Sequence, residues 1–110
     1  MLPDASVYDS TNARSLLVWC LRQKKIVLGF SENVVKAGAY AGQYGRSEDL
    51  GRQTGQLVME ILKGKDPAKI GWQYADSAGR SVNLRTADMI DKPFSEALLD
   101  KSVLRFGNEE

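Results

Sequence analysis

The sequence contains no histidine, and this absence removes several kinds of chemistry. Ser-His-Asp and Cys-His catalytic groups and metal sites built on imidazole are excluded, because each of them needs a histidine. Cys20 is the only cysteine, so no disulfide can form within the chain. It lies in an apolar run, which predicts a buried and unreactive thiol. No two acidic residues form a convincing pair for a carboxylate hydrolase. We therefore expect no enzyme, no metal and no cofactor.

A strong charge of either sign is also missing. Lys and Arg number 15 against 14 Asp and Glu, which leaves a net charge of +1 and predicts no nucleic-acid partner. No apolar run approaches the ~20 residues that cross a bilayer, so no membrane insertion is expected. The segment Met1–Asp4 lacks the basic and then apolar order of a signal peptide. As given, the chain is expected to stay where it is made.

The chain has 110 residues, which is enough for one domain with one modest core. Short apolar runs alternate with segments of helical periodicity, and this alternation predicts an α/β fold with a parallel sheet and crossover helices. We expect helices at 12–23, 48–63 and 84–90 with short ones after Ser31 and Ser95, strands at 26–30, 39–44, 70–74 and 81–83, and a frayed tail at 107–110.

Several single residues support these elements. Ser10 or Thr11, Ser31 and Asn83 can each cap a helix, because their side chains accept hydrogen bonds from the free amides of the first turn. Gly51 and Gly55 lie one turn apart in the long helix, which predicts close packing against another backbone. The chain also contains two tryptophans that we expect in the core or in an interface, Trp19 and Trp72.

Two loops carry candidate ligand groups. Ligands of parallel sheets bind beyond the carboxyl ends of the strands. The opening loop with Asp4 and Ser6, and the loop with Ser31, Glu32 and Asn33 after the most strand-like segment, are therefore candidates for one cleft. The alternative is purely structural, with Asp4 as a turn residue and Ser31 as a helix cap. Tyr40 can stack on a ligand or pack within its strand.

Short blocks of the sequence are similar, in their order, to the substrate-binding components of ABC transporters with the type I periplasmic-binding fold. The resemblance is to the branch that includes tryptophan- and tyrosine-binding members. It covers Leu2 to about Ala87, and its blocks are Leu2-Pro3-Asp4, Gly29-Phe30-Ser31-Glu32, Val35-Lys36-Ala37-Gly38-Ala39, Leu50-Gly51-Arg52-Gln53, Ile61-Leu62-Lys63-Gly64, and Val82-Asn83-Leu84 with Thr86-Ala87.

This resemblance implies a two-lobed clamp that closes on a small molecule, an amino acid being one candidate. The implied ligand groups are Asp4, Ser6, Ser31, Glu32 and Tyr40. The family chain is longer, and Asp91-Lys92-Pro93-Phe94 replaces its usual Gly-Leu-x-Ile-Pro run. A contact with an ABC permease is implied only if this chain is part of a longer one.

The sequence is expected to form one partial domain over residues 1–110. Its parts would be ligand-lobe elements at 1–46, a long crossover helix at 47–64, and closing strands and helices at 65–110. Uncovered sheet edges and apolar helix faces predict a homo-oligomer, a homodimer in particular. The alternative to solute binding is a non-catalytic interaction or sensory module, since regulators of the lactose-repressor type share this architecture.

Overall fold

The computed structural model describes residues 1–107, which form two compact units. Unit 1 contains Met1–Tyr44 and the chain from Gly79 onward, and unit 2 contains Gly45–Ala78. Of the expected frayed tail, only Gly107 is among the described residues. The division of one domain near residues 46 and 64 stays a prediction.

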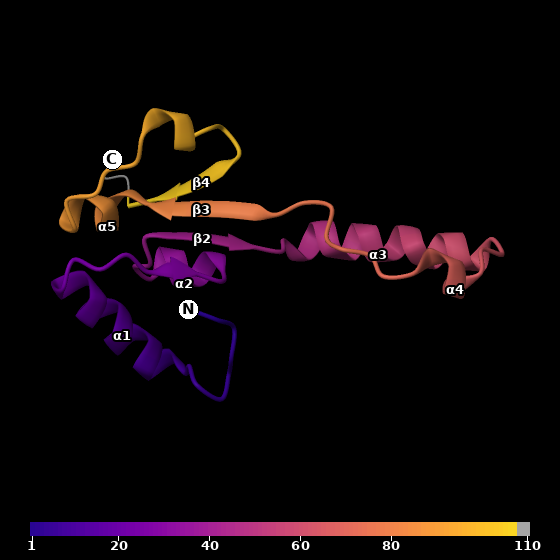
Figure 1. Cartoon of the computed structure of the whole chain (residues 1–110), viewed down its shortest axis with the longest axis horizontal. Helices are drawn as coiled ribbons and strands as arrows, with labels where there is room; N and C mark the ends of the chain where they lie inside the picture. Colours follow the sequence, from indigo (N-terminus) through magenta and orange to yellow (C-terminus); the bar gives the residue numbers. More distant parts are fainter. Residues whose placement is uncertain (108–110) are drawn as a thin grey trace. The chain divides into compact units, whose positions relative to one another are not determined.

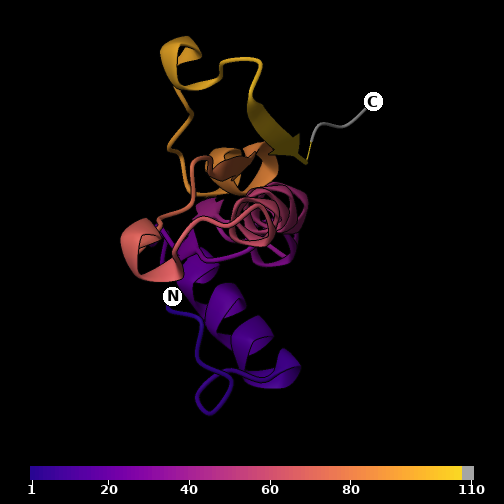
Figure 2. The same ribbon diagram turned by 90° about the vertical axis from the view of Figure 1, so that its right-hand side faces the viewer.

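Unit 1 combines a sheet with short helices, and α1 and β4 lie at its opposite ends (Figures 1 and 2). Its elements in chain order are α1 (Ser10–Arg22), β1 (Leu28–Gly29), α2 (Glu32–Lys36), β2 (Ala41–Tyr44), β3 (Gly79–Asn83), α5 (Leu84–Met89), the 3₁₀ helix η1 (Glu96–Leu98) and β4 (Val103–Phe106).

The four strands form one mostly parallel sheet in the order β1-β2-β3-β4. β1 pairs with β2 in parallel, and so does β3 with β4, because a helical crossover returns the chain to the same end of the sheet each time. β2 and β3 are antiparallel, since the chain leaves β2 into unit 2 and comes back into β3. The α/β fold class predicted from the sequence is confirmed, with this one antiparallel pairing added.

A pair of glycines lets α2 lie close to the sheet. Gly29 and Gly42 are register partners in β1 and β2. A Cβ added at Gly42 would come within 2.6 Å of Val35 Cγ2 and 3.0 Å of the Gly29 carbonyl oxygen. Val35 is fully buried against this flat patch and joins Leu17 and Ala39 in the core. Only glycine at these two strand positions leaves room for the side chain of Val35.

The N-cap of the N-terminal helix lies one residue before Ser10 and two before Thr11, the two predicted caps. Asp9, not Ser10 or Thr11, is the N-cap of α1, and its Oδ1 accepts from the amides of Thr11 and Asn12, both at 2.8 Å. Asn12 Oδ1 accepts from the Asp9 amide in return, which completes a capping box. α1 then places Leu17 and Cys20 in the core, as the sequence predicted.

Unit 2 contains the long helix α3 (Ser47–Leu62) and the short helix α4 (Pro67–Ile70). α3 lies within a residue of its predicted bounds. The predicted strand at 70–74 is wrong, because Ile70 ends α4 and Gly71 takes a φ of 65° that breaks any extended run. The segment that follows has no strand assignment, and Trp72 and Tyr74 are almost fully exposed.

Two further predictions in unit 1 are corrected. Ser95 begins only the 3₁₀ turn η1, and the chain then enters β4, which the sequence analysis missed. β4 is stabilised by tertiary pairing of Val103–Phe106 with Arg80–Asn83, so no local helical pattern could reveal it. Trp19 is more than half exposed and is not a core residue.

Asn83 connects the sheet, α2 and α5. The Asn83 side chain is buried at the end of β3, where Nδ2 donates to the Val35 carbonyl oxygen at 2.9 Å and Oδ1 accepts from the Thr86 amide at 3.0 Å. Thr86 Oγ1 donates to the Gly38 carbonyl oxygen at 3.1 Å. The predicted cap is thus confirmed, and the same side chain also fixes the end of α2.

We predict that Asn83→Ala lowers the free energy of unfolding by about 2–3 kcal/mol, because a buried carbonyl loses its partner and α5 loses its cap. Urea unfolding followed by circular dichroism at low protein concentration measures this loss. The control is Asn33→Ala, which removes an exposed amide and should change stability by less than ~0.5 kcal/mol. Equal losses in the two variants would contradict the role of Asn83.

Candidate functional site

The first part of the candidate site follows the carboxyl end of β1. Ser31 is the N-cap of α2, and its Oγ accepts from the Val34 amide at 3.3 Å. Glu32, the first residue of α2, is exposed. Among residues 1–107 no hydrogen bond or ion pair holds its carboxylate. The structure therefore gives Ser31 a local role as a cap and leaves the Glu32 carboxylate exposed.

The second part is the opening loop, which begins beside the same strand. The Met1 amino group donates to the Leu28 carbonyl oxygen at 2.9 Å, so the chain starts next to β1. Asp4 then closes a turn, because its Oδ1 accepts from the Ser6 amide at 2.9 Å and from Ser6 Oγ at 2.6 Å. Its carbonyl oxygen accepts from the Tyr8 amide at 2.9 Å.

These contacts hold Asp4 in its charged form. The hydrogen bond from the Ser6 hydroxyl, and after it the one from the Ser6 amide, lower the pKa of the Asp4 carboxyl below its ordinary value. Both bonds end on Oδ1. The other carboxylate oxygen has no protein partner within residues 1–107. Asp4 is thus both a turn residue and an exposed, ionised acceptor.

Both loops are joined to β1, one through Met1 and one through the chain that leaves the strand, and they do not bond to each other in the described part of the chain. Asp4 lies three residues from Met1, a span of at most ~10 Å, and Met1 is fixed beside β1. Ser31 and Glu32 leave β1 directly. Together the loops supply two carboxylates and two hydroxyls, a set dominated by acceptors. Such a set suits a ligand that donates hydrogen bonds and carries positive charge.

Tyr40 lies elsewhere in unit 1. Tyr40 directly precedes β2, and its amide donates to the carbonyl oxygen of Val27. Val27 lies just before the amino end of β1, and an extended chain from Val27 to Ser31 is about 13 Å long. Its ring stacks on Phe94 with centroids 4.2 Å apart, and its hydroxyl donates to the Lys92 carbonyl oxygen at 3.1 Å. The structure therefore brings Tyr40 to the C-terminal segment and not to Ser31 and Glu32.

Phe94 also lines a separate small hollow of about 330 Å³ in unit 1, which is partly open to solvent. Asp88 is its one charged lining residue. The remaining lining residues are Leu84, Ala87, Pro93, Leu99 and Gly107. The sequence analysis missed this hollow because its walls come from α5 and from the irregular chain after it.

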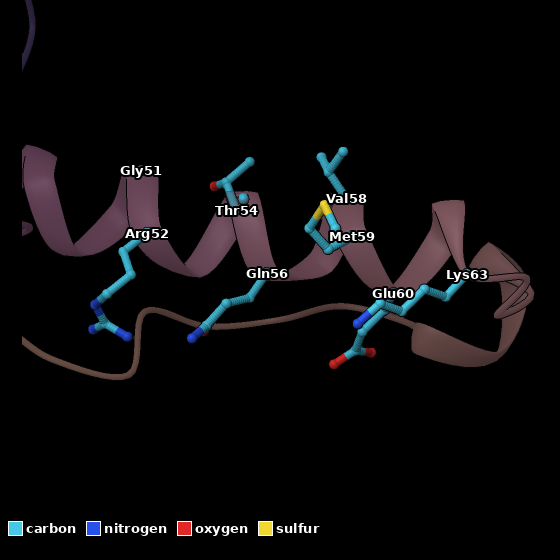
Figure 3. Close-up of a pocket in the computed structure, with 9 residues that line it drawn as sticks. Gly51, Arg52, Thr54, Gln56, Val58, Met59, Glu60 and Lys63 are labelled. Carbon is cyan, nitrogen blue, oxygen red and sulfur yellow. The ribbon is translucent and has the colours of Figure 1, made fainter.

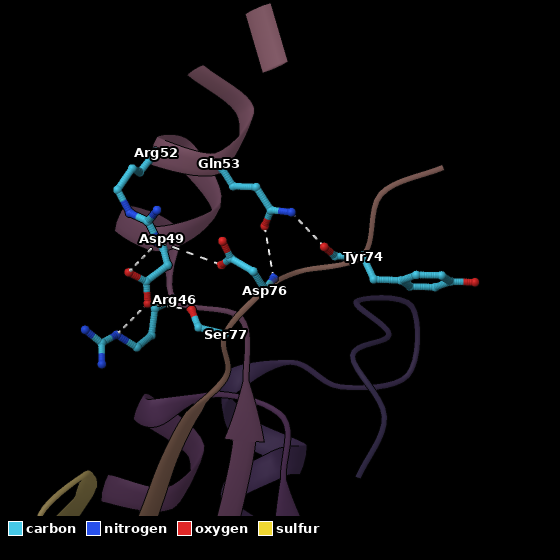
Figure 4. A network of polar contacts seen from close by, with 7 residues as sticks. All are labelled: Arg46, Asp49, Arg52, Gln53, Tyr74, Asp76 and Ser77. Carbon is cyan, nitrogen blue, oxygen red and sulfur yellow. Dashed lines mark hydrogen bonds and ion pairs between the residues drawn. The ribbon is translucent and has the colours of Figure 1, made fainter. Parts of the chain in front are cut away.

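Unit 2 carries a polar network around Asp49 (Figure 4). Asp49 Oδ2 lies 3.2 Å from Arg46 Nε and accepts from Ser77 Oγ at 2.9 Å. Arg52 lies 3.8 Å from both Asp49 and Asp76. The sequence analysis did not identify this network, because the partners Asp76 and Ser77 are distant from Asp49 along the chain.

Gln53 extends this network along α3. Its Nε2 donates to the Tyr74 carbonyl oxygen at 2.7 Å, and its Oε1 accepts from the Asp76 amide at 3.1 Å (Figure 4). A single amide side chain thus forms hydrogen bonds with two backbone groups of the segment at 74–77. The network fixes the segment at 74–77 against α3, and we assign it a structural role.

No three acidic or cysteine side chains in residues 1–107 are grouped so that they could hold a metal ion. None of the helices in that range is long and apolar enough to cross a bilayer.

The comparison with known families agrees with the geometry of unit 1. A family model described as ABC transporter substrate binding protein matches residues 2–103. The chain belongs to this family. No curated protein matches the sequence.

Three solved structures have the same fold. One is the ligand-free, open structure of a substrate binding protein with adhesive properties from Clostridium difficile, at 18% identity and a TM-score of 0.69 over 90% of this chain. Another is a conserved domain protein from Vibrio cholerae, at 25% identity and a TM-score of 0.64 over 88% of this chain. The third is an ABC domain in complex with L-Trp from Streptococcus pneumonia, at 21% identity and a TM-score of 0.63 over 88%.

This member of the ABC substrate-binding family spans about a third of each of these structures, namely 32%, 32% and 33% of their chains. The match includes both the opening loop and the loop after β1, since it begins at residue 2. The family is thus shown by the sequence, and the arrangement of strands by the structures.

We predict that Ser6→Ala raises the pKa of Asp4 towards its ordinary value, because the substitution removes the hydroxyl that donates to the Asp4 carboxylate and weakens the turn. Carboxyl-carbon NMR titration measures the change. Because the pKa of Asp4 is lowered in the folded state, its carboxylate stabilises the turn at pH values above the unfolded-state pKa of about 3.9. This contribution is lost as the pH falls through the folded-state pKa. Ser15→Ala, which removes an exposed hydroxyl bonded to Thr11, is the control and should leave Asp4 unchanged.

Proposed function

We propose that this chain supplies one side of a solute-binding site, and that the solute is a small molecule with a cationic amino group, such as an amino acid. The observation that carries the proposal is the Glu32 carboxylate, which lies exposed after β1 and is held by no partner in residues 1–107. A carboxylate at the end of a parallel strand is well placed for a ligand, because ligands of such sheets bind at that edge.

Asp4 and the two hydroxyls add to this site. Asp4 is ionised and presents one oxygen that the turn leaves free. Ser31 and Ser6 are already used for local hydrogen bonds, so they orient the loops and offer their remaining lone pairs. Two carboxylates on neighbouring loops attract an ammonium group more strongly than one. Tyr40 would contribute only if the ligand reached the amino end of β1.

Membership of the substrate-binding family supports solute binding and a non-catalytic role. The Streptococcus structure with L-Trp supports an amino acid as the first candidate. Because the chain spans a third of these relatives, the clamp that encloses a ligand in the type I fold, and any contact with an ABC permease, would require a longer polypeptide.

We infer weak binding by the chain alone. Groups on one side of a ligand cannot exclude water, and a hydrogen bond exposed to water contributes little net free energy. The dissociation constant should be near the millimolar range, which corresponds to about −4 kcal/mol.

A second candidate function is an interaction module that has kept the fold. Trp72 and Tyr74 favour it, since both are almost fully exposed on unit 2, and aromatic residues of this kind are enriched in protein contacts. In this reading the chain is a homo-oligomer, and the ligand groups of unit 1 are not used.

The test compares L-tryptophan with indole-3-propionate, which has the same ring and carboxylate but no amino group. We expect L-tryptophan alone to bind measurably in NMR titrations of the 110-residue chain. Glu32→Gln and Asp4→Asn should each weaken this binding about threefold to tenfold, because each removes one charge-assisted contact.

The matched control is Glu96→Gln, an exposed acidic residue of unit 1 at η1, which should leave binding unchanged. Equal binding of the two compounds, or L-tryptophan binding that survives both Glu32→Gln and Asp4→Asn, would show that the site is not at these loops.

A further inference from the structure

The groups assigned to the candidate site in unit 1 are polar. Carboxylate and hydroxyl oxygens are all that the two loops supply, from Asp4, Ser6, Ser31 and Glu32. Sites for small molecules are lined mostly by apolar and aromatic side chains, with a few polar groups that fix the orientation of the ligand. A site at these loops therefore needs an apolar surface beside Ser31 and Glu32.

Unit 2 has an open hollow along α3, which does not provide such a surface (Figure 3). Its lining residues all belong to α3 or to Lys63, the C-cap of that helix. Val58 and Met59 line it and are exposed by 48% and 52%. A hollow along a single helix has no opposite wall, so it cannot enclose the apolar part of a small ligand.

In unit 1, Tyr44 lies at the carboxyl end of β2, the strand next to β1. The two strands are parallel, and Gly29 is the register partner of Gly42. Two residues after Gly29 comes Ser31, and two residues after Gly42 comes Tyr44, so both lie at the same edge of the sheet. Neighbouring strands are about 5 Å apart. The backbone of Tyr44 is thus adjacent to the loop that carries Ser31 and Glu32.

The side chain of Tyr44 projects from the face of the sheet that α2 covers. A Cβ added at Gly42 would lie 2.6 Å from Val35 Cγ2, so position 42 faces α2. Tyr44 faces the same way, because side chains two residues apart in a strand share a face. α2 begins at Glu32 beyond the end of β1, and it lies along β2 (Figure 1). The start of α2 and the Tyr44 side chain are therefore neighbours.

The Tyr44 ring has few protein contacts of its own. It is half-buried, and within residues 1–107 it has no aromatic partner and its hydroxyl has no hydrogen bond. Its register partner in β3 is Gly79, which has no side chain to fill the space beside the ring. Tyr40 differs, since its ring stacks on Phe94 and its hydroxyl is bonded. Tyr44 thus offers a flat apolar surface beside the ligand groups.

We propose that Tyr44 is the specificity-determining residue of the candidate site, and that it selects solutes in which a flat aromatic ring is joined to the cationic amino group. In an aromatic amino acid only the α and β carbons separate the amino group from the ring. The amino group can then lie at Glu32 while the ring packs on Tyr44, the two being neighbours. This role of Tyr44 rests on the proposed function, which places the amino group at Glu32.

The experiment compares L-tryptophan with L-leucine in NMR titrations of the full 110-residue chain. Both carry the same charged groups, so the ratio of their dissociation constants reports the contact with the side chain. The wild type should bind L-tryptophan about threefold to tenfold more tightly, because ring stacking is added to apolar burial. Tyr44→Leu keeps an apolar side chain in β2 but removes the ring, and should bring the ratio to within about twofold of one.

Two further variants separate ring stacking from a structural role. Tyr44→Phe keeps the ring and should keep the wild-type ratio, since the hydroxyl has no partner in residues 1–107. Gln43→Leu is the matched control, because it places the same side chain one residue along β2, at an exposed position on the opposite face. It should also keep the wild-type ratio. A general loss of stability would weaken both ligands equally and leave the ratio unchanged.

A Tyr44→Leu variant that keeps the wild-type preference for L-tryptophan would overturn the role of Tyr44. If its L-tryptophan binding also still depends on the amino group and on Glu32, the proposed function stands without it. Equal binding of L-tryptophan and indole-3-propionate, with both weakened by Tyr44→Leu, would instead reject the cationic contact of the proposed function and support the ring contact. A chain that binds neither amino acid would refute both.

Discussion

The buried amide of Asn83 is the interaction on which unit 1 depends. It ends β3, caps α5 and satisfies the Val35 carbonyl at the end of α2, all with one side chain. An amide can do this because it offers both donors and an acceptor, and burial makes each bond costly to lose. Thr86 adds a bond to the Gly38 carbonyl and so fixes the loop between α2 and β2. A sheet whose first strand has two residues needs such a fixed point, since its own ladder contributes few hydrogen bonds.

The position of the candidate site depends on how α2 packs against the sheet. Gly29 and Gly42 allow Val35 to lie on the sheet, and Val35 holds α2 at the end of β1. Ser31 then caps α2, which places Glu32 at the surface beside the strand end. Asp4 follows three residues after Met1, whose amino group is bonded to the Leu28 carbonyl oxygen of β1. The carboxylates are thus held by main-chain geometry, while their charged ends stay in water and remain available.

Unit 2 is stabilised differently. Asp49 and Gln53 hold the segment at 74–77 through polar contacts at the surface, and such contacts each contribute little in water. α3 buries no residue, so its apolar face and its two open glycines, Gly51 and Gly55, have no compensation within the described chain.

Local patterns in the sequence determined the helices α1, α2, α3 and α5. The caps at Ser31 and Asn83, the periodicity of α3 and the burial of Cys20 all depend on neighbours within a few residues, and the family blocks span the same elements. Only the tertiary structure decided what depends on distant pairing. β4 exists because Val103–Phe106 pair with β3, and the strand expected at 70–74 is absent because no strand in unit 2 pairs with it among the described residues. The same holds for the site. The sequence indicated Asp4, Glu32 and Tyr40 together, but in the structure Tyr40 lies beside Val27, at the other end of β1 from Ser31. Its ring stacks on Phe94, a residue distant along the chain, and a contact of this kind can be found only in the tertiary structure.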